Sequence, residues 1–353
     1  MPAFAGADRV VEQLLDAFTP TNTYTVYVVR DGARTSAPAP NRRYVRIPAL
    51  RGKYLRAPSY FLLCCLHFVF VARCSVAHVH NSDFGVFCPL LRLRRGVRIV
   101  GTFHGDPSIR DKWGSLARLF LRGSEWAFVR SCDTLTSVDG EKTVAGRVVH
   151  YIPNGFTPSG ALVPPESGFP YSSDQLSERN YVMFACGRLD KTKGLHHLLA
   201  AYREIPTDLP LLVVGDFSHD SKYSDAVSAL AANDGRLVLC ERLLNRTTLQ
   251  YVLGRCAVFV FPSDVEAMSM MLLEAIAAAP VVICSDIPAN LAVVGEDYPL
   301  LFSAGDPASL RAVLTRTLER GGGTGDLERV RDRLRERFRW DHIARDYEML
   351  YAG

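Results

Sequence analysis

Short apolar runs recur along the first half of the chain and alternate with longer segments in which the apolar residues follow a helical spacing. The runs have the length and the β-branched character of buried strands, and the longer segments are typical of helices. We predict strands at 24–29, 76–80, 98–103, 134–137 and 148–152, and helices at 7–18, 60–72 and 111–131. Strands that alternate with helices in this way indicate a parallel sheet covered by helices.

A second series of the same kind follows residues 158–180, which are rich in Pro, Ser, Gly and Glu and are typical of a linker. We predict strands at 181–185, 211–214, 237–240, 257–261 and 281–284, and helices at 194–202 and 270–278. The glycine-rich residues 321–325 then interrupt the pattern before an amphipathic segment at 327–351. The prediction is an α/β fold with doubly wound domains at 1–157 and 181–326, the linker 158–180, and a helical segment 327–353 that packs back across the domains.

The composition agrees with two globular domains. The chain has 353 residues, more than one ordinary core holds, and its 48% hydrophobic and 22% charged residues exclude a disordered chain. The net charge of +4 is too small to indicate nucleic-acid binding without a recognition motif, and we find none. Nine cysteines without a paired C-x-x-C spacing favour reduced thiols and a cytoplasmic location, and the first residues do not resemble a signal peptide.

A basic segment precedes the apolar residues 60–72, which are too few to cross a bilayer. Its cations are Arg42, Arg43, Arg46, Arg51, Lys53 and Arg56. Basic residues beside an apolar run can contact an anionic membrane surface, so we expect a possible peripheral association with the inner face of the membrane. The alternative that we favour is a core helix behind a solvated basic loop, because the run is apolar on every face.

Two glutamates interrupt the most apolar part of the chain, residues 257–280. Glu266 lies in a predicted loop after a buried strand, and Glu274 lies in the apolar helix that follows. A charged side chain is rarely placed in such a segment unless it is paired, hydrogen-bonded or facing a ligand. We interpret both glutamates as ligand contacts; the alternative for Glu274 is a buried carboxylate that caps a neighbouring loop.

A basic loop follows the first strand of the second domain, at the edge of the sheet where α/β proteins bind their ligands. Gly187 and Arg188 open it, and Lys193 stands directly before the next predicted helix. A guanidinium, an ammonium and a helix N-terminus are the groups with which proteins hold phosphate. The loop therefore predicts phosphate binding, although Lys193 alone could equally be a surface lysine.

The residues around Glu266 extend this predicted site. The backbone amides of Ala267, Met268, Ser269 and Met270, at the start of the apolar helix, can face an anion. Glu266 can accept hydrogen bonds from sugar hydroxyls, and Glu274 would lie about 12 Å further on if the intervening residues are helical. A diphosphate that joins a sugar to a nucleoside fits this separation.

Two turns of the first domain are further candidates. His104 follows a predicted strand and precedes a glycine, so its imidazole could approach a ligand closely. Gly6 and Asp8 precede the first predicted helix and form a second possible ligand-facing turn. The alternatives are that His104 is a hydrogen-bonded strand-end histidine and that Asp8 is a helix N-cap.

Several chemistries have no motif in the chain. We find no G-x-x-x-x-G-K-[ST] loop, no G-x-S-x-G elbow and no H-E-x-x-H pair. An Asp-x-Asp pair that could clamp a metal diphosphate is also missing. We therefore expect no metal and no cofactor, with Arg188 and Lys193 neutralising the phosphates of a nucleotide diphosphate sugar co-substrate.

These motifs in combination resemble the second domain of glycosyltransferase family 4, which are retaining enzymes of the GT-B fold. The resemblance is carried by residues 187–194, by Glu266 and Glu274 with seven residues between them, and by residues 280–282. Residues 47–53, 78–81, 88–91 and 110–114 look like the bacterial rhamnosyltransferase-type subgroup, and residues 340–344 are similar to the family's closing helix, which returns to the first domain. The resemblance implies two Rossmann-like domains that face a cleft.

The resemblance also implies roles for the candidate residues. Arg188 and Lys193 would bind the donor diphosphate, Glu266 the hydroxyls of the donor sugar, and Glu274 the ribose. His104 would lie beside the transferred sugar, with Gly6 and Asp8 on the acceptor side. The chain departs from the family in two places: Ala267, Met268 and Ser269 replace a glycine-rich stretch, and the apolar first strand that should precede Gly6 is missing.

From this resemblance we expect a glycosyltransferase that moves a sugar from a nucleotide diphosphate sugar to a glycan or lipid-linked glycan with retention, in cell-surface polysaccharide synthesis. One alternative is a nucleotide-sugar epimerase or hydrolase of similar fold. Another is a binding pseudoenzyme, because the first domain lacks a strand. A glycosidase that uses Glu266 and Glu274 is disfavoured, since its carboxylates must flank one bond.

Overall fold

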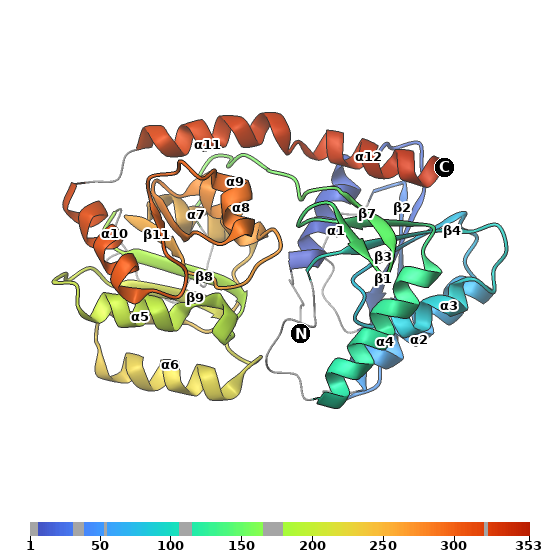
Figure 1. The fold of residues 1–353 in the computed structure, drawn as a ribbon, viewed down its shortest axis with the longest axis horizontal. Coiled ribbons are helices and arrows are strands. Elements are labelled where there is room, and N and C mark those ends of the chain that lie inside the picture. The colour runs from blue at the N-terminus through green and yellow to red at the C-terminus, as the bar shows by residue number, and fades with distance from the viewer. Residues whose placement is uncertain (1–5, 31–38, 53–54, 106–114, 165–178, 321–323) are drawn as a thin grey trace. The chain divides into compact units, whose positions relative to one another are not determined.

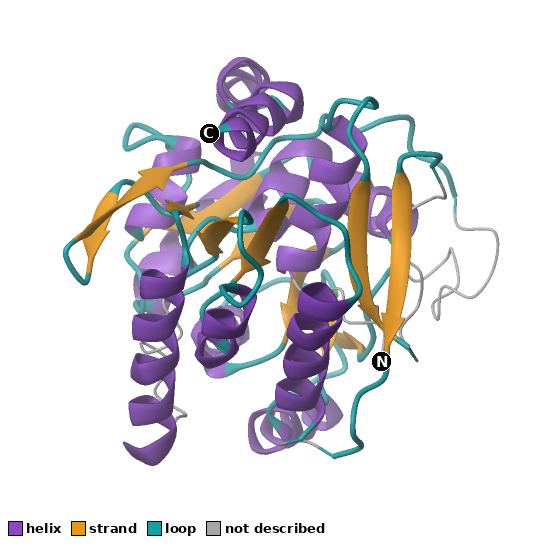
Figure 2. Cartoon of the chain, turned by 90° about the vertical axis from the view of Figure 1, so that its right-hand side faces the viewer, coloured by secondary structure: helices purple, strands orange, loops and turns teal. Residues whose placement is uncertain are grey.

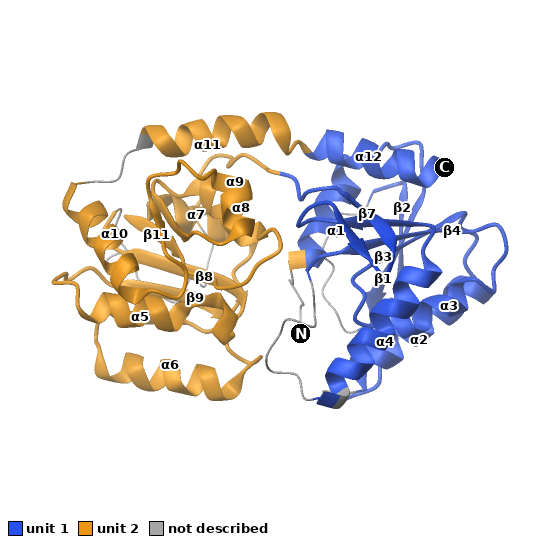
Figure 3. Cartoon of the chain, in the orientation of Figure 1, with its two compact units in different colours: residues 1–3, 7–155, 340–353 blue, residues 4–6, 156–339 orange. Residues whose placement is uncertain are grey.

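A computed structural model describes residues 6–30, 39–52, 55–105, 115–164, 179–320 and 324–353. The chain divides into two compact units, coloured separately in Figure 3. The first unit contains residues 7–155 together with the final residues 340–353, and the second contains residues 156–339. The predicted residues Lys53, 110–114 and most of the linker and of the glycine-rich break lie outside the described residues.

The first unit consists of two sheets and the helices around them (Figure 1). Its strands are β1 (Tyr24–Val29), β2 (Arg42–Ile47), β3 (Val76–His80), β4 (Arg98–Phe103), β5 (Thr134–Ser137), β6 (Lys142–Val144) and β7 (Arg147–Tyr151). Its helices are α1 (Gly6–Ala17), α2 (Arg56–Phe70), η1 (Gly85–Phe87), α3 (Cys88–Leu91), α4 (Ser115–Ser131) and α12 (Trp340–Ala352). Figure 2 views this unit, with helices on both sides of the strands.

The two sheets of the first unit share no ladder among the residues described. The larger sheet has the order β3-β4-β5-β7-β6, in which only the β6–β7 hairpin is antiparallel. β1 and β2 form a separate parallel pair with Tyr24 opposite Arg42. The predicted lack of a first strand concerns residues before α1, and these lie outside the described residues.

The second unit is built on one parallel sheet of six strands, in the order β10-β9-β8-β11-β12-β13. The strands are β8 (Val182–Arg188), β9 (Leu211–Asp216), β10 (Leu237–Cys240), β11 (Val258–Phe261), β12 (Val282–Ser285) and β13 (Leu301–Phe302). The helical elements are η3 (Lys191–Lys193), α5 (Leu195–Arg203), α6 (Ser221–Asn233), α7 (Arg246–Arg255), α8 (Met270–Ala278), α9 (Pro288–Val294), α10 (Pro307–Arg320) and α11 (Thr324–Arg337). Because the chain order reverses from β8 to β11, the unit is doubly wound, as predicted.

The core of the second unit explains why its strands are continuous apolar runs. β11 and β12 are buried at every position, and β8 and β9 are buried over their first five residues. Parallel strands that carry helices on both faces expose neither face to water, so no polar alternation is expected. Helix starts are marked by local chemistry: the Asn245 side chain accepts from Thr248 N at the start of α7, and Pro288 occupies the first turn of α9.

The structure corrects two predictions about individual elements and divides a third element in two. The basic residues from Arg42 to Arg46 lie in β2, which pairs with β1, and not in a loop. Arg42 also donates to Asp16 and to the carbonyl of Leu15. The final amphipathic segment is two helices, α11 and α12, that end and begin on either side of Phe338. The first helix begins at Gly6, so Gly6 and Asp8 belong to the first turn of α1 and not to a preceding turn.

Candidate functional site

The loop between β8 and α5 has the shape expected of a ligand-binding loop. β8 contains a register shift between Ala185 and Arg188 near its end, and the Asp190 side chain then accepts from the Thr192 amide at the start of η3. Gly194 has a φ of 68°, and a Cβ atom there would lie 1.8 Å from the carbonyl oxygen of Pro262. Only glycine fits this position, because both the backbone conformation and the contact exclude a side chain. The loop is thereby held against the segment that follows β11.

Lys193 and Glu266 meet where these two segments touch. Lys193 Nζ donates to Glu266 Oε1 at 2.7 Å, and Ser263 Oγ donates to the same oxygen at 2.9 Å. The side chains are 23% and 11% exposed. Burial alone would lower the pKa of Lys193, but the Glu266 carboxylate outweighs it and raises the pKa above its ordinary value. Lys193 is therefore an ammonium at neutral pH, ready to meet an anion.

Further bonds join the same two segments. The Asp264 amide donates to the Thr192 carbonyl at 2.9 Å, and His197 Nε2 lies 3.1 Å from an Asp264 carboxylate oxygen. Beneath them, Ser285 Oγ donates to the Ser263 carbonyl at 2.6 Å. The loops at the carboxyl ends of β8 and β11 therefore form one connected structure.

The remaining donor-side candidates surround this pair. Arg188 is exposed at the end of β8, and Gly187 lies in the bulge before it. Ala267, Met268 and Ser269 precede α8, where the Ser269 side chain accepts from the Leu272 amide. Glu274 lies in α8 and is partly buried. Because residues 266–269 are not helical, the predicted 12 Å separation along a helix does not apply to Glu266 and Glu274.

The first unit has a cluster of histidines at the carboxyl ends of β3 and β4. His80 Nδ1 lies 2.9 Å from His104 Nε2, and the His78 and His80 rings lie 4.0 Å apart. The backbone amide of His104 donates to the Asn81 side chain at 3.3 Å. His104 is thus held on two sides, as the hydrogen-bonded alternative expected, and one ring nitrogen is engaged by His80.

Helix α12 completes the cluster within the same unit. His78 Nδ1 lies 2.7 Å from the Tyr351 hydroxyl, and His78 Nε2 lies 2.7 Å from Thr102 Oγ1. Burial lowers the pKa of His104 to about 4, and burial together with His104 lowers that of His78 to about 3. These imidazoles are therefore neutral at pH 7.

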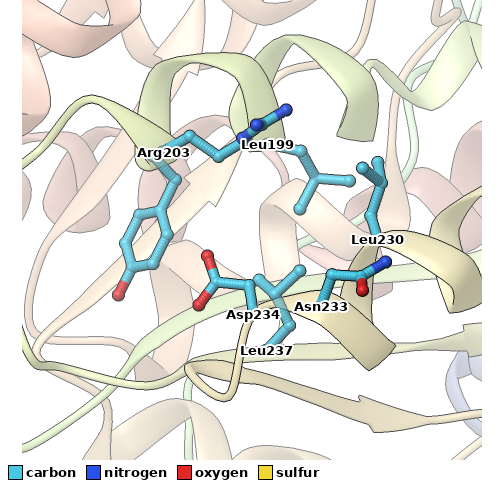
Figure 4. Close-up of a pocket in the computed structure, with 7 residues that line it drawn as sticks. Leu199, Arg203, Leu230, Asn233, Asp234 and Leu237 are labelled. Carbon is cyan, nitrogen blue, oxygen red and sulfur yellow. The ribbon is translucent and has the colours of Figure 1, made fainter.

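The other first-unit candidates are less informative. Gly6 and Asp8 lie in the first turn of α1, where Asp8 is partly buried and favourably placed at the positive end of the helix dipole. A separate hollow of about 260 Å³ lies in the second unit between α5 and α6 (Figure 4). Its lining includes Leu199 and Leu237, the first residue of β10, so it lies at the opposite edge of the sheet from Lys193 and Glu266.

Sequence reasoning did not identify the residues that support the candidates. Ser263, Asp264 and His197 hold the donor-side loops, and His80 holds His104. The alternating histidines at 78 and 80 were a usable signal, because both side chains of such a pair lie on one face of a strand. Nothing in the sequence near Asp264 indicates that it contacts His197 and Thr192, which lie 67 and 72 positions earlier in the chain.

Comparison with known proteins matches both halves of the chain. Residues 4–159 match the family model described as Glycosyltransferase Family 4, and residues 172–338 match the one described as Glycosyl transferases group 1. The α-maltose-1-phosphate synthase of Mycolicibacterium smegmatis is 28% identical, over 91% of this chain and 88% of its own length.

Two solved structures share the fold. The α,α-trehalose-phosphate synthase (UDP-forming) of Burkholderia xenovorans, in complex with glucose-6-phosphate, aligns with a TM-score of 0.75 at 17% identity, over 100% of this chain and 96% of that one. The sucrose-phosphate synthase of Thermosynechococcus elongatus aligns with a TM-score of 0.71 at 19% identity, over 98% and 92%. With two Rossmann-like units and glycosyltransferase matches to both, the chain belongs to the GT-B glycosyltransferases.

Proposed function

We propose that the protein transfers a sugar from a nucleotide diphosphate sugar to a hydroxyl group, with retention of the anomeric configuration. The observation that supports it best is the pairing of Lys193 with Glu266 at the carboxyl ends of β8 and β11. A cation for the diphosphate and a carboxylate for the sugar hydroxyls are thus held side by side. Arg188, at the end of β8, supplies a second cation, and Glu274 takes the ribose.

The transfer step depends on the leaving group. As the bond between the anomeric carbon and the diphosphate oxygen breaks, negative charge grows on the diphosphate, where Lys193 and Arg188 stabilise it. The acceptor oxygen then bonds to the anomeric carbon from the same face and passes its proton to the leaving phosphate. This route needs no covalent nucleophile. Neutral His104, beside the transferred sugar, orients it by a hydrogen bond.

The acceptor that we favour is a glycan or lipid-linked glycan of the cell surface, as in the rhamnosyltransferase-type subgroup. This choice is supported by exposed apolar residues of the first unit on α2 and α4, two helices that both contact α3. Leu119 and Trp126 on α4 are 68% and 58% exposed, and Phe70 at the end of α2 is 76% exposed. Exposed apolar side chains of this size mark an interaction surface.

Cations accompany these apolar residues. Arg118, Arg122 and Arg130 are exposed on the same helix, and the Arg130 guanidinium lies 5.5 Å from the Trp126 ring centre. Apolar residues with arginines beside them suit an anionic lipid surface. We therefore propose peripheral membrane contact through α4 and the end of α2, and not through β2. None of the described helices is both long and apolar enough to cross a membrane.

A second acceptor class is favoured by the relatives. The curated relative and both solved structures are named as synthases of sugar phosphates, and one of them is named in complex with glucose-6-phosphate. A sugar phosphate is therefore the alternative acceptor. It predicts turnover that does not need a membrane.

A donor panel followed by an acceptor panel tests the proposal. Calorimetry with UDP-, GDP- and dTDP-sugars should show one preferred donor, and Arg188→Ala or Lys193→Ala should weaken its binding at least tenfold. The preferred donor is then incubated with sugar phosphates or with lipid-linked glycans in vesicles, and the product is separated from free sugar. A flat calorimetric response to every nucleotide sugar contradicts the donor site. A free or altered sugar without an acceptor product would favour the hydrolase or epimerase alternative.

A further inference from the structure

The second unit contains a group of potential metal ligands that the proposed sugar transfer does not use. His196 and His197 lie in the first turn of α5, and Asp264 lies in the loop after β11. One ligand atom from each of the three lies within 4.8 Å of the others. All three side chains are partly buried, so they are neither fully solvated nor sealed in the core.

We propose that His196, His197 and Asp264 bind one divalent transition-metal ion of the zinc type. Two imidazole nitrogens and one carboxylate oxygen are ligands that zinc prefers, and three protein ligands leave a fourth position for water. Bond lengths of about 2.0–2.1 Å in a tetrahedron separate neighbouring ligands by roughly 3.3 Å. His197 Nε2 lies 3.1 and 3.2 Å from the two Asp264 oxygens, so this pair already has the required spacing.

Tyr223 of α6 provides the outer contact that metal-binding histidines usually have. Its hydroxyl lies 3.0 Å from the His196 amide nitrogen and 3.1 Å from His196 Nδ1. Since Nδ1 is engaged, Nε2 is the nitrogen left to bind an ion, and Tyr223 then accepts the proton on Nδ1.

The two histidine rings also lie close together. The two rings lie 3.9 Å apart, centre to centre, although adjacent helical residues ordinarily point in different directions. The ion pair between His197 and Asp264 accounts for two of the three side chains, and the contact with Tyr223 holds His196 beside them.

The backbone around the group is fixed before any ion binds. Gly194 holds the start of α5 against Pro262, and the Asp264 amide donates to Thr192. An ion here would join the loop after β8 to the loop after β11. Its ligands are different from Lys193 and Glu266, so this inference does not depend on sugar transfer.

Titration with cobalt and zinc chlorides tests the site in the full chain. Tetrahedral Co²⁺ gives visible absorption bands when bound by nitrogen and oxygen, and Zn²⁺ should then displace it at one equivalent. We expect His196→Gln and Asp264→Asn each to weaken binding at least tenfold. The matched control is His342→Gln, because His342 is an exposed histidine 4.0 Å from Asp341 and should leave binding unchanged.

Two further readouts show whether the variants are folded and which residues bind the ion. Thermal unfolding without metal shows whether each variant is folded, and Asp264→Asn preserves side-chain size if the histidine variant is unstable. A thiolate–cobalt charge-transfer band would assign the ion to the cysteines instead and would overturn the inference. It is also overturned if no stoichiometric ion binds, or if both variants bind as tightly as the wild type.

Discussion

The ammonium nitrogen of Lys193 lies 2.7 Å from Oε1 of Glu266, although 73 residues separate the two in the chain. In the proposed complex these groups serve different parts of one donor, Lys193 the diphosphate and Glu266 the sugar. Without a ligand, the Lys193 ammonium and the Glu266 carboxylate form an ion pair with each other. Donor binding must therefore break this ion pair, so that Lys193 contacts the diphosphate and Glu266 contacts the sugar. The diphosphate and the sugar must lose their water at the same time.

Replacement of Glu266 by Gln separates the ion pair with Lys193 from the proposed contact with the donor sugar. We expect the free energy of unfolding to fall by about 1 kcal/mol, because a partly buried ion pair is lost but Ser263 can still donate to the amide oxygen. Under the proposed function, kcat/KM should fall about 100-fold, since the sugar hydroxyls lose a charged acceptor. Urea unfolding and initial rates measure the two effects. An unchanged rate with reduced stability would assign the pair a structural role alone.

Gly194→Ala tests whether the two donor-side loops are held together by close backbone contact. The added Cβ would strain a φ of 68° and collide with the Pro262 carbonyl, so we expect a loss of about 2 kcal/mol or more in the free energy of unfolding. The matched control is Gly235→Ala, where nothing lies within 4 Å of the new atom. Chemical denaturation of both variants makes the comparison, and equal stability would contradict it.

His80 is proposed to position His104 through the 2.9 Å contact between their ring nitrogens. If His104 acts beside the transferred sugar, His80→Ala should lower kcat about tenfold and leave donor affinity unchanged. His80→Asn should restore part of the rate, because its amide can still form a hydrogen bond. The exposed His150 of β7 offers the control His150→Ala. Equal losses in His80→Ala and His80→Asn would contradict a positioning role.

The neutral histidines predict acid sensitivity. His78 and His104 have pKa values lowered by burial to about 3 and about 4, whereas an unfolded histidine titrates near 6.5. Below pH about 6.5 the unfolded chain therefore binds more protons, and stability falls as the pH decreases toward 4. We expect about 1 kcal/mol per pH unit for each histidine. His78→Gln should reduce this slope in urea unfolding measured from pH 7 to pH 4.5; a slope equal to the wild type's would contradict the assignment.

The α4 surface predicts binding to anionic vesicles. Leu119→Ser combined with Trp126→Ser should reduce co-sedimentation with phosphatidylglycerol-containing vesicles at least fivefold, because both exposed apolar anchors are lost. Met349→Ser is the matched control, since Met349 is an exposed apolar residue on α12. Equal binding by the double variant and the wild type would refute contact through this helix and would favour the sugar-phosphate acceptor.

The regular elements were predictable where a single local pattern determined them. The strands at 76–80, 98–103, 134–137 and 237–240 and the helix at 270–278 have the predicted bounds. β2 was missed because its arginines suggested a loop, and only their long-range bonds to α1 explain a strand. Local patterns also did not identify α6, α7, α9 and α10.

The sequence was enough to predict which residues belong to the candidate site, but not which residues they contact. Arg188, Lys193 and Glu266 were selected because each lies after a strand in an α/β sheet. That Lys193 and Glu266 pair, and that Asp264 bonds to the loop of Thr192, depends on the adjacency of β8 and β11, which the chain order does not reveal. The same limit applies to His80 and His104, which meet because β3 pairs with β4.

The pair of strands formed by β1 and β2 has a ladder of its own, and side chains link it to helices: Tyr24 donates to Glu348 of α12, and Arg42 donates to Asp16 of α1. A two-stranded sheet is marginal by itself, so its opening need not wait for the unfolding of the larger sheet. Backbone amides of residues 24–29 and 42–47 should therefore exchange with deuterium earlier than those of β4. The first unit would then contain two separately opening segments of different stability.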